Sequence, residues 1–337
     1  MVHHIPRVGS SKIRLSVAII DEGVTMGKIS QEKRTEGYCK VAGQLCENPF
    51  MHREKIAKNA KLSRNTVSEY LKSMYTKNIL IGPWMSLNPH SDYKEYVYLM
   101  NFSDPFHAYK GLKGFPHVVY PGIALGDWNT IVITDRQLDF PQLVGFESVV
   151  YQGVKGNVYT PKIKYTAWDQ SLKKIYEHIE KFTPGEPEPK KRLVPPLNWE
   201  EDQWKLYHAF KVNVRKKVTP LLRNIKVRYE TYLQWMKTLQ DHCTIHTEFY
   251  PQGCNTYLCH CYLLSSDYNQ SIISLFSLFP TTPVIMEVGD RLLVFLKVVS
   301  SNVTRGMIYT IFDMKAVEMI KEFSSAVVVS KSRCVML

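Results

Sequence analysis

The chain has 337 residues, 45% of them hydrophobic, which suits two or more globular domains with sizeable cores. Its 43 Lys and Arg against 31 Asp and Glu give a formal charge of +12, which favours a polyanionic partner such as nucleic acid or an anionic membrane surface. No apolar run of about 18 residues exists, so a membrane-spanning helix is excluded. A secretory signal pattern is missing, and the seven cysteines, an odd number, indicate reduced thiols and a cytoplasmic protein.

A proline-rich segment at residues 183–197 (TPGEPEPKKRLVPPL) predicts a semi-rigid linker between two halves. The halves repeat the same order of features about 165 residues apart, which indicates a tandem structural repeat. The matched features are the apolar pairs Leu80/Trp84 and Ile245/Phe249 and the dipeptides Gly126-Asp127 and Gly289-Asp290.

The first half begins with three predicted helices, at residues 31–48, 52–60 and 63–75. Ser63 is a good N-cap for the third, and Val67, Leu71 and Met74 form its buried stripe. A short helix, a tight turn and a helix with a polar face predict a helix-turn-helix. Residues 79–87 follow as two short strands around Gly82-Pro83, which predicts a β-wing.

The polar face of this third helix is our candidate DNA-binding surface, because a helix of this kind enters the major groove. We expect Arg64, Asn65 and Ser68 to contact bases, and His52, Arg53, Lys61, Lys72 and Lys77 to contact phosphates. Ser63, Thr66 and Glu69 complete the candidate set.

The rest of the first half predicts a βαββαβ, ferredoxin-like order with Gly126-Asp127 at its central hairpin. Its elements are strands at 93–102, 117–125, 128–134 and 148–159 and helices at 104–114 and 139–145. An amphipathic helix at 168–182 precedes the linker.

The second half predicts the same order with a helix-turn-helix whose polar face is less suited to reading bases. Arg223, Lys226, Arg228 and Tyr229 are its candidate DNA contacts, for phosphates, unless this unit is only structural. Its helices are expected at 200–212, 214–224, 227–239, 269–278 and 307–323, and its strands at 244–250, 257–264, 284–288, 292–299 and 326–329.

The run from Leu62 to Met74, the segment from Asn78 to Pro89 and the Gly-Asp hairpins resemble the Lrp/AsnC (feast/famine) family of transcription regulators. The resemblance implies a DNA-binding dimer or higher oligomer that is not an enzyme and has no catalytic residues. It also implies an amino-acid-like effector near Gly126, Asp127, Gly289 and Asp290, and no other cofactor.

The expected fold class is therefore α+β, with two tandem units, each a winged helix-turn-helix followed by a ferredoxin-like domain. The predicted divisions are an arm (1–30), winged helix-turn-helix 1 (31–90), ferredoxin-like domain 1 (91–182), the linker (183–197), winged helix-turn-helix 2 (198–252) and ferredoxin-like domain 2 (253–337). Family members usually carry one copy, so the expected partners are double-stranded DNA and either a second chain or, within one chain, the other half; no membrane is expected.

Two alternatives stay open. Siroheme decarboxylases resemble this architecture, pairing two Lrp-like halves around a tetrapyrrole, and such an enzyme predicts a buried cationic pocket for carboxylates. A thiol- or metal-responsive regulator is the other, because residues 242–261 are dense in Cys and His. Their spacing departs from structural zinc sites, so no metal is predicted; the ligands of such a site would be Cys243, Cys254, Cys259 and Cys261.

Overall fold

The computed structural model describes residues 30–162, 165–186, 194–299 and 301–329, and these residues form a mixed α+β fold, as predicted. Residues 1–29 of the predicted arm and residues 187–193 of the predicted linker lie outside the described residues. In the part of the chain that is described, no helix is long and apolar enough to cross a membrane.

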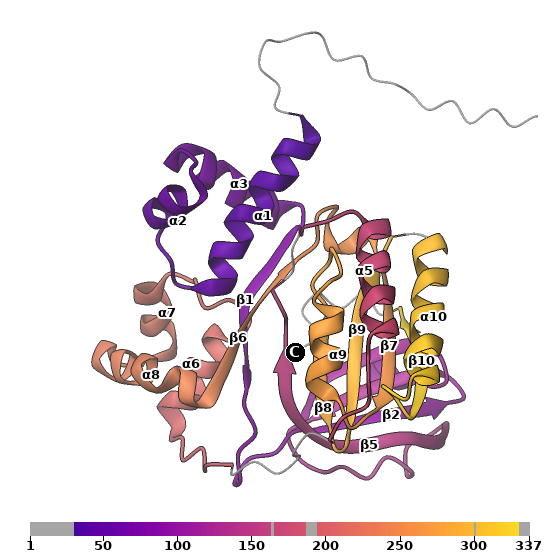
Figure 1. Ribbon diagram of the computed structural model, residues 1–337. Coiled ribbons are helices and arrows are strands. Elements are labelled where there is room, and N and C mark those ends of the chain that lie inside the picture. The colour runs from indigo at the N-terminus through magenta and orange to yellow at the C-terminus, as the bar shows by residue number, and fades with distance from the viewer. Residues whose placement is uncertain (1–29, 163–164, 187–193, 300, 330–337) are drawn as a thin grey trace, which may run out of the picture.

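Two modules of three helices lie together at one side of the molecule (Figure 1). Ser63 caps α3 by accepting a hydrogen bond from the Thr66 amide at 3.0 Å, and Val67, Leu71 and Met74 are buried, which confirms the expected cap and stripe. The first module consists of α1 (Gln31–Glu47), α2 (Arg53–Ala60) and α3 (Arg64–Thr76), and the second of α6 (Glu201–Phe210), α7 (Val218–Ile225) and α8 (Tyr229–His242).

The two predicted wings are wrong, because each is a single strand that pairs with the other. Strand β1 (Leu80–Leu87) runs antiparallel to β6 (Cys243–Phe249), with Leu80 opposite Phe249 and Leu87 opposite Cys243. The Gly82-Pro83 step, read from the sequence as a turn, is a cis peptide at a bulge within β1. Both strands are largely buried, so neither is available as an exposed wing.

The remaining strands close into an eight-stranded barrel in the order β10-β3-β4-β2-β5-β8-β9-β7. One half of the chain contributes four neighbouring strands: β2 (Tyr96–Phe102), β3 (Val118–Gly126), β4 (Thr130–Thr134) and β5 (Phe146–Tyr159). The other contributes β7 (Leu258–Ser265), β8 (Val284–Val288), β9 (Arg291–Val298) and β10 (Glu322–Val328), and the short 3-10 helix η1 (Cys254–Thr256) precedes β7. The two seams, β5 with β8 and β10 with β3, pair the halves within one chain.

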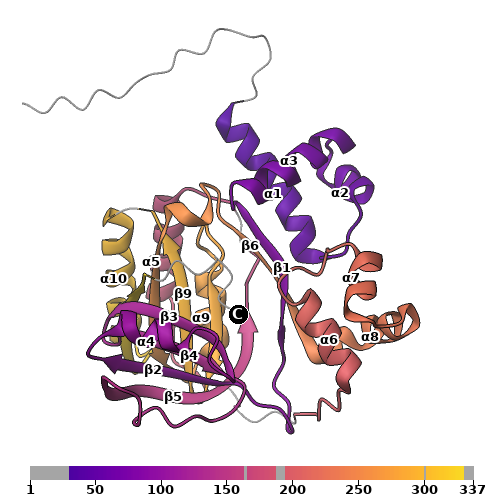
Figure 2. The ribbon, with the colours of Figure 1, turned by 180° about the vertical axis from the view of Figure 1, so that it is seen from behind.

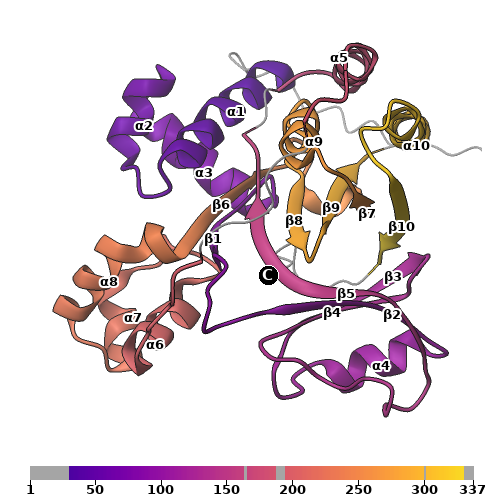
Figure 3. The ribbon, with the colours of Figure 1, turned by 60° about the horizontal axis from the view of Figure 1, so that its bottom comes forward.

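Helices cover the two sheets unequally (Figure 3). In the described part of the chain α4 (Pro105–Leu112) alone lies on the first sheet. The helix predicted at residues 139–145 is wrong, because this segment is a loop with turns. On the second sheet lie α9 (Asn269–Phe276), α10 (Ser301–Ala316) and α5 (Trp168–Glu180), the last arriving from the first half of the chain. The helix predicted at 307–323 is α10, which begins and ends earlier than expected. Strand β10 begins at Glu322, within the range predicted for that helix.

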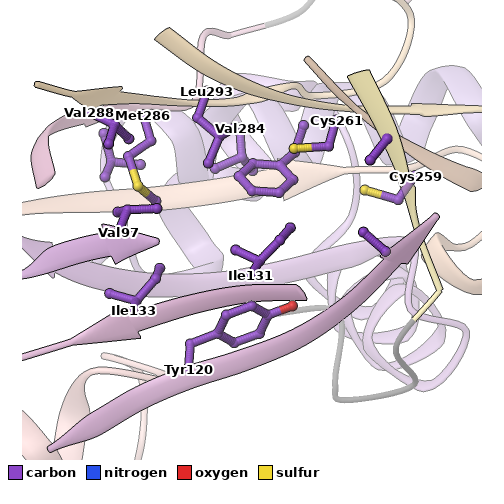
Figure 4. Close-up of a cluster of buried hydrophobic side chains, with 14 of the residues drawn as sticks. Val97, Tyr120, Ile131, Ile133, Cys259, Cys261, Val284, Met286, Val288 and Leu293 are labelled. Carbon is purple, nitrogen blue, oxygen red and sulfur yellow. The ribbon is translucent and has the colours of Figure 1, made fainter. Parts of the chain in front are cut away.

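Apolar side chains from both sheets fill the space between them (Figure 4). Val97, Ile131 and Ile133 from the first sheet meet Met286 and Leu293 from the second, and all five are at most 2% exposed. Burial of this interface removes apolar surface from water and stabilises the pairing of the two halves.

The two Gly-Asp hairpins lock the two seams. Asp127 accepts a hydrogen bond from the Ser325 amide of β10 at 2.7 Å, and its own amide donates to the Ser325 carbonyl at 2.9 Å. At the other seam, Asp290 accepts a hydrogen bond from the Tyr151 hydroxyl of β5 at 2.7 Å. The dipeptides that the sequence assigned to an effector site therefore join the two halves. Figure 2 shows the molecule from behind, with β3 and β4 beside the second sheet.

We predict that Gly126→Ala destabilises the protein by about 2–3 kcal/mol. Gly126 has φ +155° and a Cβ there would lie 2.4 Å from the Ser325 carbonyl oxygen, so the β10–β3 seam must open. Chemical denaturation followed by circular dichroism measures the change. The matched control is Gly111→Ala on α4, where a Cβ meets nothing within 4 Å and helix propensity favours alanine by up to about 1 kcal/mol. Equal stability of the two variants would contradict the seam's role.

Candidate functional site

A pocket of about 700 Å³ lies between the first helical module and the second half of the chain. One wall is α1 with the C-terminal end of α2, and the other is the segment that follows β5, with Lys162 and Tyr165. Phe249 at the end of β6 and Thr282 form its floor. Its volume falls within the roughly 300–1,000 Å³ typical of small-molecule sites. The pocket therefore exists only because the two halves pack together.

Three lysines line this pocket: Lys40 on α1, Lys61 at the end of α2 and Lys162 after β5. Two are paired at the exposed surface, Lys40 with Glu36 at 2.8 Å and Lys162 with Glu47. Exposed pairs of this kind contribute little and exchange readily, so these ammonium groups are available to an anionic ligand. Among the lining residues the lysines outnumber the single carboxylate, Glu36, and the site favours anions.

Two thiols also line the pocket, and burial keeps both protonated. Burial raises the pKa of Cys39, against a smaller opposing effect from the Tyr165 backbone and Lys162. Burial raises the pKa of Cys46 to about 12, and its thiol donates to the Thr247 carbonyl at 3.8 Å. Neither cysteine is an activated thiolate nucleophile, because only a lowered pKa provides one near neutral pH. The two thiols therefore line the pocket as protonated, weakly polar groups rather than as nucleophiles.

A buried charged network lies beneath the floor, with members from both halves. The Glu248 carboxylate accepts a hydrogen bond from the Trp84 indole at 2.7 Å and another from the Tyr250 hydroxyl, and the Lys297 ammonium lies 3.9 Å away. Burial acts to lower the pKa of Lys297, but Glu248 with the nearby Cys259 and Cys254 outweighs it and the pKa is raised. Tyr250 also donates to the Thr282 carbonyl at 3.2 Å, which ties the network to the pocket floor.

His246 on β6 is fully buried beside this network. Its ring lies 4.2 Å from that of Trp84, with Nε2 2.8 Å from the Ser86 hydroxyl and Nδ1 3.1 Å from the Thr160 hydroxyl. Burial lowers the pKa of His246 to about 3, with a smaller contribution from Lys155. The imidazole is therefore neutral and joins strands β1 and β6 to the end of β5.

The candidate DNA-binding residues lie on the outer surface of the first module. Arg64 forms an ion pair with Glu54 of α2 at 3.1 Å. Helix α3 leads into β1, and α8 leads into β6. Because β1 and β6 are antiparallel, the two helices expected to read DNA lie at opposite ends of a strand pair about 20 Å long. Exposed positions are His52, Arg53, Lys61, Ser63, Arg64, Asn65, Glu69, Lys72 and Lys77, and Thr66 and Ser68 are half-buried; in the second module Arg223, Lys226, Arg228 and Tyr229 are exposed.

The four cysteines considered as metal ligands are not brought together as one set. Cys259 and Cys261 point into the barrel core with Cys254 near them, whereas Cys243 belongs to the core of the second helical module. Burial raises the pKa of Cys243 to about 12 and raises that of Cys261 too. Within the described ranges no three His, Cys, Asp or Glu side chains are grouped so that they could hold a metal ion.

Comparison with known proteins gives structural similarity alone. No model of a known protein family matches this chain, and no curated protein matches it. Two similar solved structures are crystal structures of the siroheme decarboxylase NirDL. The alignment with the first structure covers 87% of this chain and 91% of the NirDL chain, at 9% identity and a TM-score of 0.45. The second, in co-complex with an iron-uroporphyrin III analogue, covers 89% and 92%, at 10% identity and a TM-score of 0.39.

The prediction of an Lrp/AsnC-type transcription regulator that is not an enzyme is contradicted. The similar structures are those of an enzyme, and no family model or curated protein supports a DNA-binding regulator. The sequence-based prediction depended on a β-wing beside the DNA-reading helix. The strands expected to form the two wings are instead buried against each other. At these identities no residue role passes from those structures to this chain.

Sequence reasoning missed most of the pocket. Lys61 was singled out, as a phosphate contact, but Lys40, Lys162, Cys39 and Tyr165 were not. No local signal marks them, since a lysine on a helix or in a loop has the same pattern whether it faces solvent or a pocket. The sequence did predict a basic protein, and part of that charge lies around this site.

We predict that acid destabilises the protein through His246. Because its native pKa lies below the ordinary 6.5, the unfolded chain binds the proton first: stability is complete above about pH 6.5 and is lost toward pH 3, by about 1.4 kcal/mol per pH unit. Denaturant midpoints at about pH 7.5 and about pH 5 measure the slope. His246→Asn removes the titrating group, so its slope should be shallower. Parallel slopes in the two proteins would exclude His246 as the cause.

Proposed function

We propose that this chain is a tetrapyrrole-binding enzyme of the siroheme decarboxylase type, and that the pocket beside α1 is its substrate site. One observation carries the proposal: Lys40, Lys61 and Lys162 surround a large pocket whose floor includes Phe249. This arrangement suits a substrate with a flat apolar body and several carboxylates at its edge. A cytoplasmic setting agrees with its reduced cysteines, and in the described residues six cysteines are free thiols.

The proposal includes a fold made of two tandem units. Each unit begins with a three-helix module and one long strand and continues into a four-stranded sheet, with sheet orders β5-β2-β4-β3 and β10-β7-β9-β8. This is the strand order of a ferredoxin-like domain, in which the first strand lies beside the last and the third. The first unit departs from the pattern, because turns replace its second helix.

A lysine ammonium group is a point charge on a flexible stem and carries three N–H donors. It can therefore pair with a carboxylate in many orientations. Lys162 reaches the pocket over Gly43, where a Cβ would lie 3.6 Å from its Cε, so the stem of this lysine covers α1 while the charge remains at the rim. With three such groups around the opening, a polycarboxylate is held at several points of its edge.

In a decarboxylation the bond between the substrate carbon and its carboxylate breaks, CO₂ leaves, and the carbon takes up a proton. Among the lining residues that carry a proton, Cys46 donates its own to the Thr247 carbonyl and the lysines are assigned to the carboxylates, which leaves the Cys39 thiol and the Tyr165 hydroxyl. We propose these two as the candidate proton sources. Because no histidine belongs to the described lining, recognition should depend on carboxylates rather than on a metal in the macrocycle.

We predict that uroporphyrin III binds and that Lys40→Met and Lys162→Met each weaken binding roughly tenfold, since each removes a charge-assisted contact but keeps an apolar stem. Titrations followed by the Soret absorbance measure the affinity. Lys110→Met on α4, away from the pocket, is the matched control and should not change it. Affinity should fall with added salt.

The iron-free and iron-containing macrocycles should bind with affinities within about tenfold of each other. Incubation of the iron form, followed by mass spectrometry, tests the reaction, because each decarboxylation makes the product lighter than the substrate by the mass of one CO₂. Binding to the iron form alone, or unaltered binding in both lysine variants, would contradict the assignment of this pocket as the substrate site.

A further inference from the structure

Helix α10 carries an apolar stripe on its outer surface. Its inner face, Val303, Met307, Ile311 and Met314, is buried against the second sheet and the helices beside it. On the other side Ile308, Tyr309 and Phe312 are 43%, 57% and 55% exposed. The apolar side chains of α10 are thus divided between a core face and an outer face.

Two opposite charges flank the stripe at equal distances. Arg305 lies one turn before Tyr309 and Asp313 one turn after it, so each is about 6 Å along the helix axis from Tyr309. Both side chains are exposed, and neither forms an ion pair within the described residues. A helix face with an apolar centre and opposite charges at its two ends is complementary to itself when it is turned end to end.

We propose that this face binds a second copy of the chain, with α10 packed antiparallel against α10 of the partner about a two-fold axis at Tyr309. In this arrangement Arg305 lies level with Asp313 of the partner subunit, and the reverse pair forms by symmetry. The aromatic rings of Tyr309 and Phe312 are covered at the centre. Because the two charges are opposite in sign and equally spaced about Tyr309, a single two-fold contact pairs both of them.

The adjoining surface of α5 extends the contact. Tyr176 of α5 donates a hydrogen bond to the Gly306 carbonyl of α10 at 3.0 Å, and Leu172 packs where a Gly306 side chain would be. A shallow groove runs along this face of α5, lined by Leu172 and Tyr176 and by the charged Asp169, Lys173, Glu177 and Glu180. Since α10 is only about 24 Å long, the interface is small and the dimer is a weak one. This inference does not depend on the proposed enzymatic function.

Charge exchange tests the arrangement. Arg305→Asp and Asp313→Arg should each weaken dimerisation at least tenfold, because each places like charges opposite each other. The double variant with both substitutions restores opposite pairs and should associate within about threefold of the natural chain. Sedimentation velocity on the full chain up to roughly 200 µM, the range of weak interfaces, measures the dissociation constants. Lys237→Asp, at an exposed position of α8 in the second helical module, is the matched control and should leave association unchanged.

Circular dichroism establishes that every variant is folded. Tyr309→Cys gives an independent measurement: a residue on the two-fold axis should form a disulfide-linked dimer under mild oxidation, whereas the natural chain treated in parallel should not. A natural chain that is monomeric over the whole concentration range would overturn the proposal. Dimers that persist in both single variants, or that are not restored in the double variant, would overturn it as well.

Discussion

Every strand at the edge of either four-stranded sheet is paired with a strand of the other half, and this closure underlies the rest of the structure. An open sheet edge presents unpaired amide and carbonyl groups and invites unspecific association. Here β5 pairs with β8 and β10 with β3, and Asp127 and Tyr151 add side-chain hydrogen bonds at the same seams. The barrel therefore behaves as one body, although its two sheets come from opposite halves of the chain.

The same pairing places charged groups where neither half alone would tolerate them. Glu248 and Lys297 are almost fully buried, which is costly for an ion pair unless other hydrogen bonds satisfy it. Trp84 from the first half and Tyr250 from the second supply those hydrogen bonds. The network favours one packing of the halves, since a slipped arrangement would remove the Trp84 hydrogen bond from the buried Glu248 carboxylate. Above it, the floor of the proposed substrate pocket is held in position through Thr282.

Unequal covering of the sheets separates the surfaces by role. Helix α5 leaves its own half and packs on the second sheet, where Ile175 and Ile179 join the core. The chain that leads to it from β5 passes α1 and provides Lys162 and Tyr165 to the pocket. One crossover thus forms a pocket wall at its start and extends the outer face beside α10 at its end. The proposed substrate pocket and the proposed dimer face lie at the two ends of this connection.

The sequence by itself determined the local elements: the Ser63 cap, the Val67, Leu71 and Met74 stripe and most strands depend on neighbouring residues and short-range periodicity. It did not determine which segments of the chain pair with one another. Leu80 to Leu87 has the same pattern whether it forms a hairpin wing or pairs with β6, because alternation records burial but not which strand lies beside it. Lys40, Lys61 and Lys162 are likewise far apart in the chain, and only the tertiary structure brings their charges around one pocket. Hydrogen-bond ladders and ligand sites are made by segments remote in sequence, and for that reason the barrel, its seams and the pocket emerged only from the folded chain.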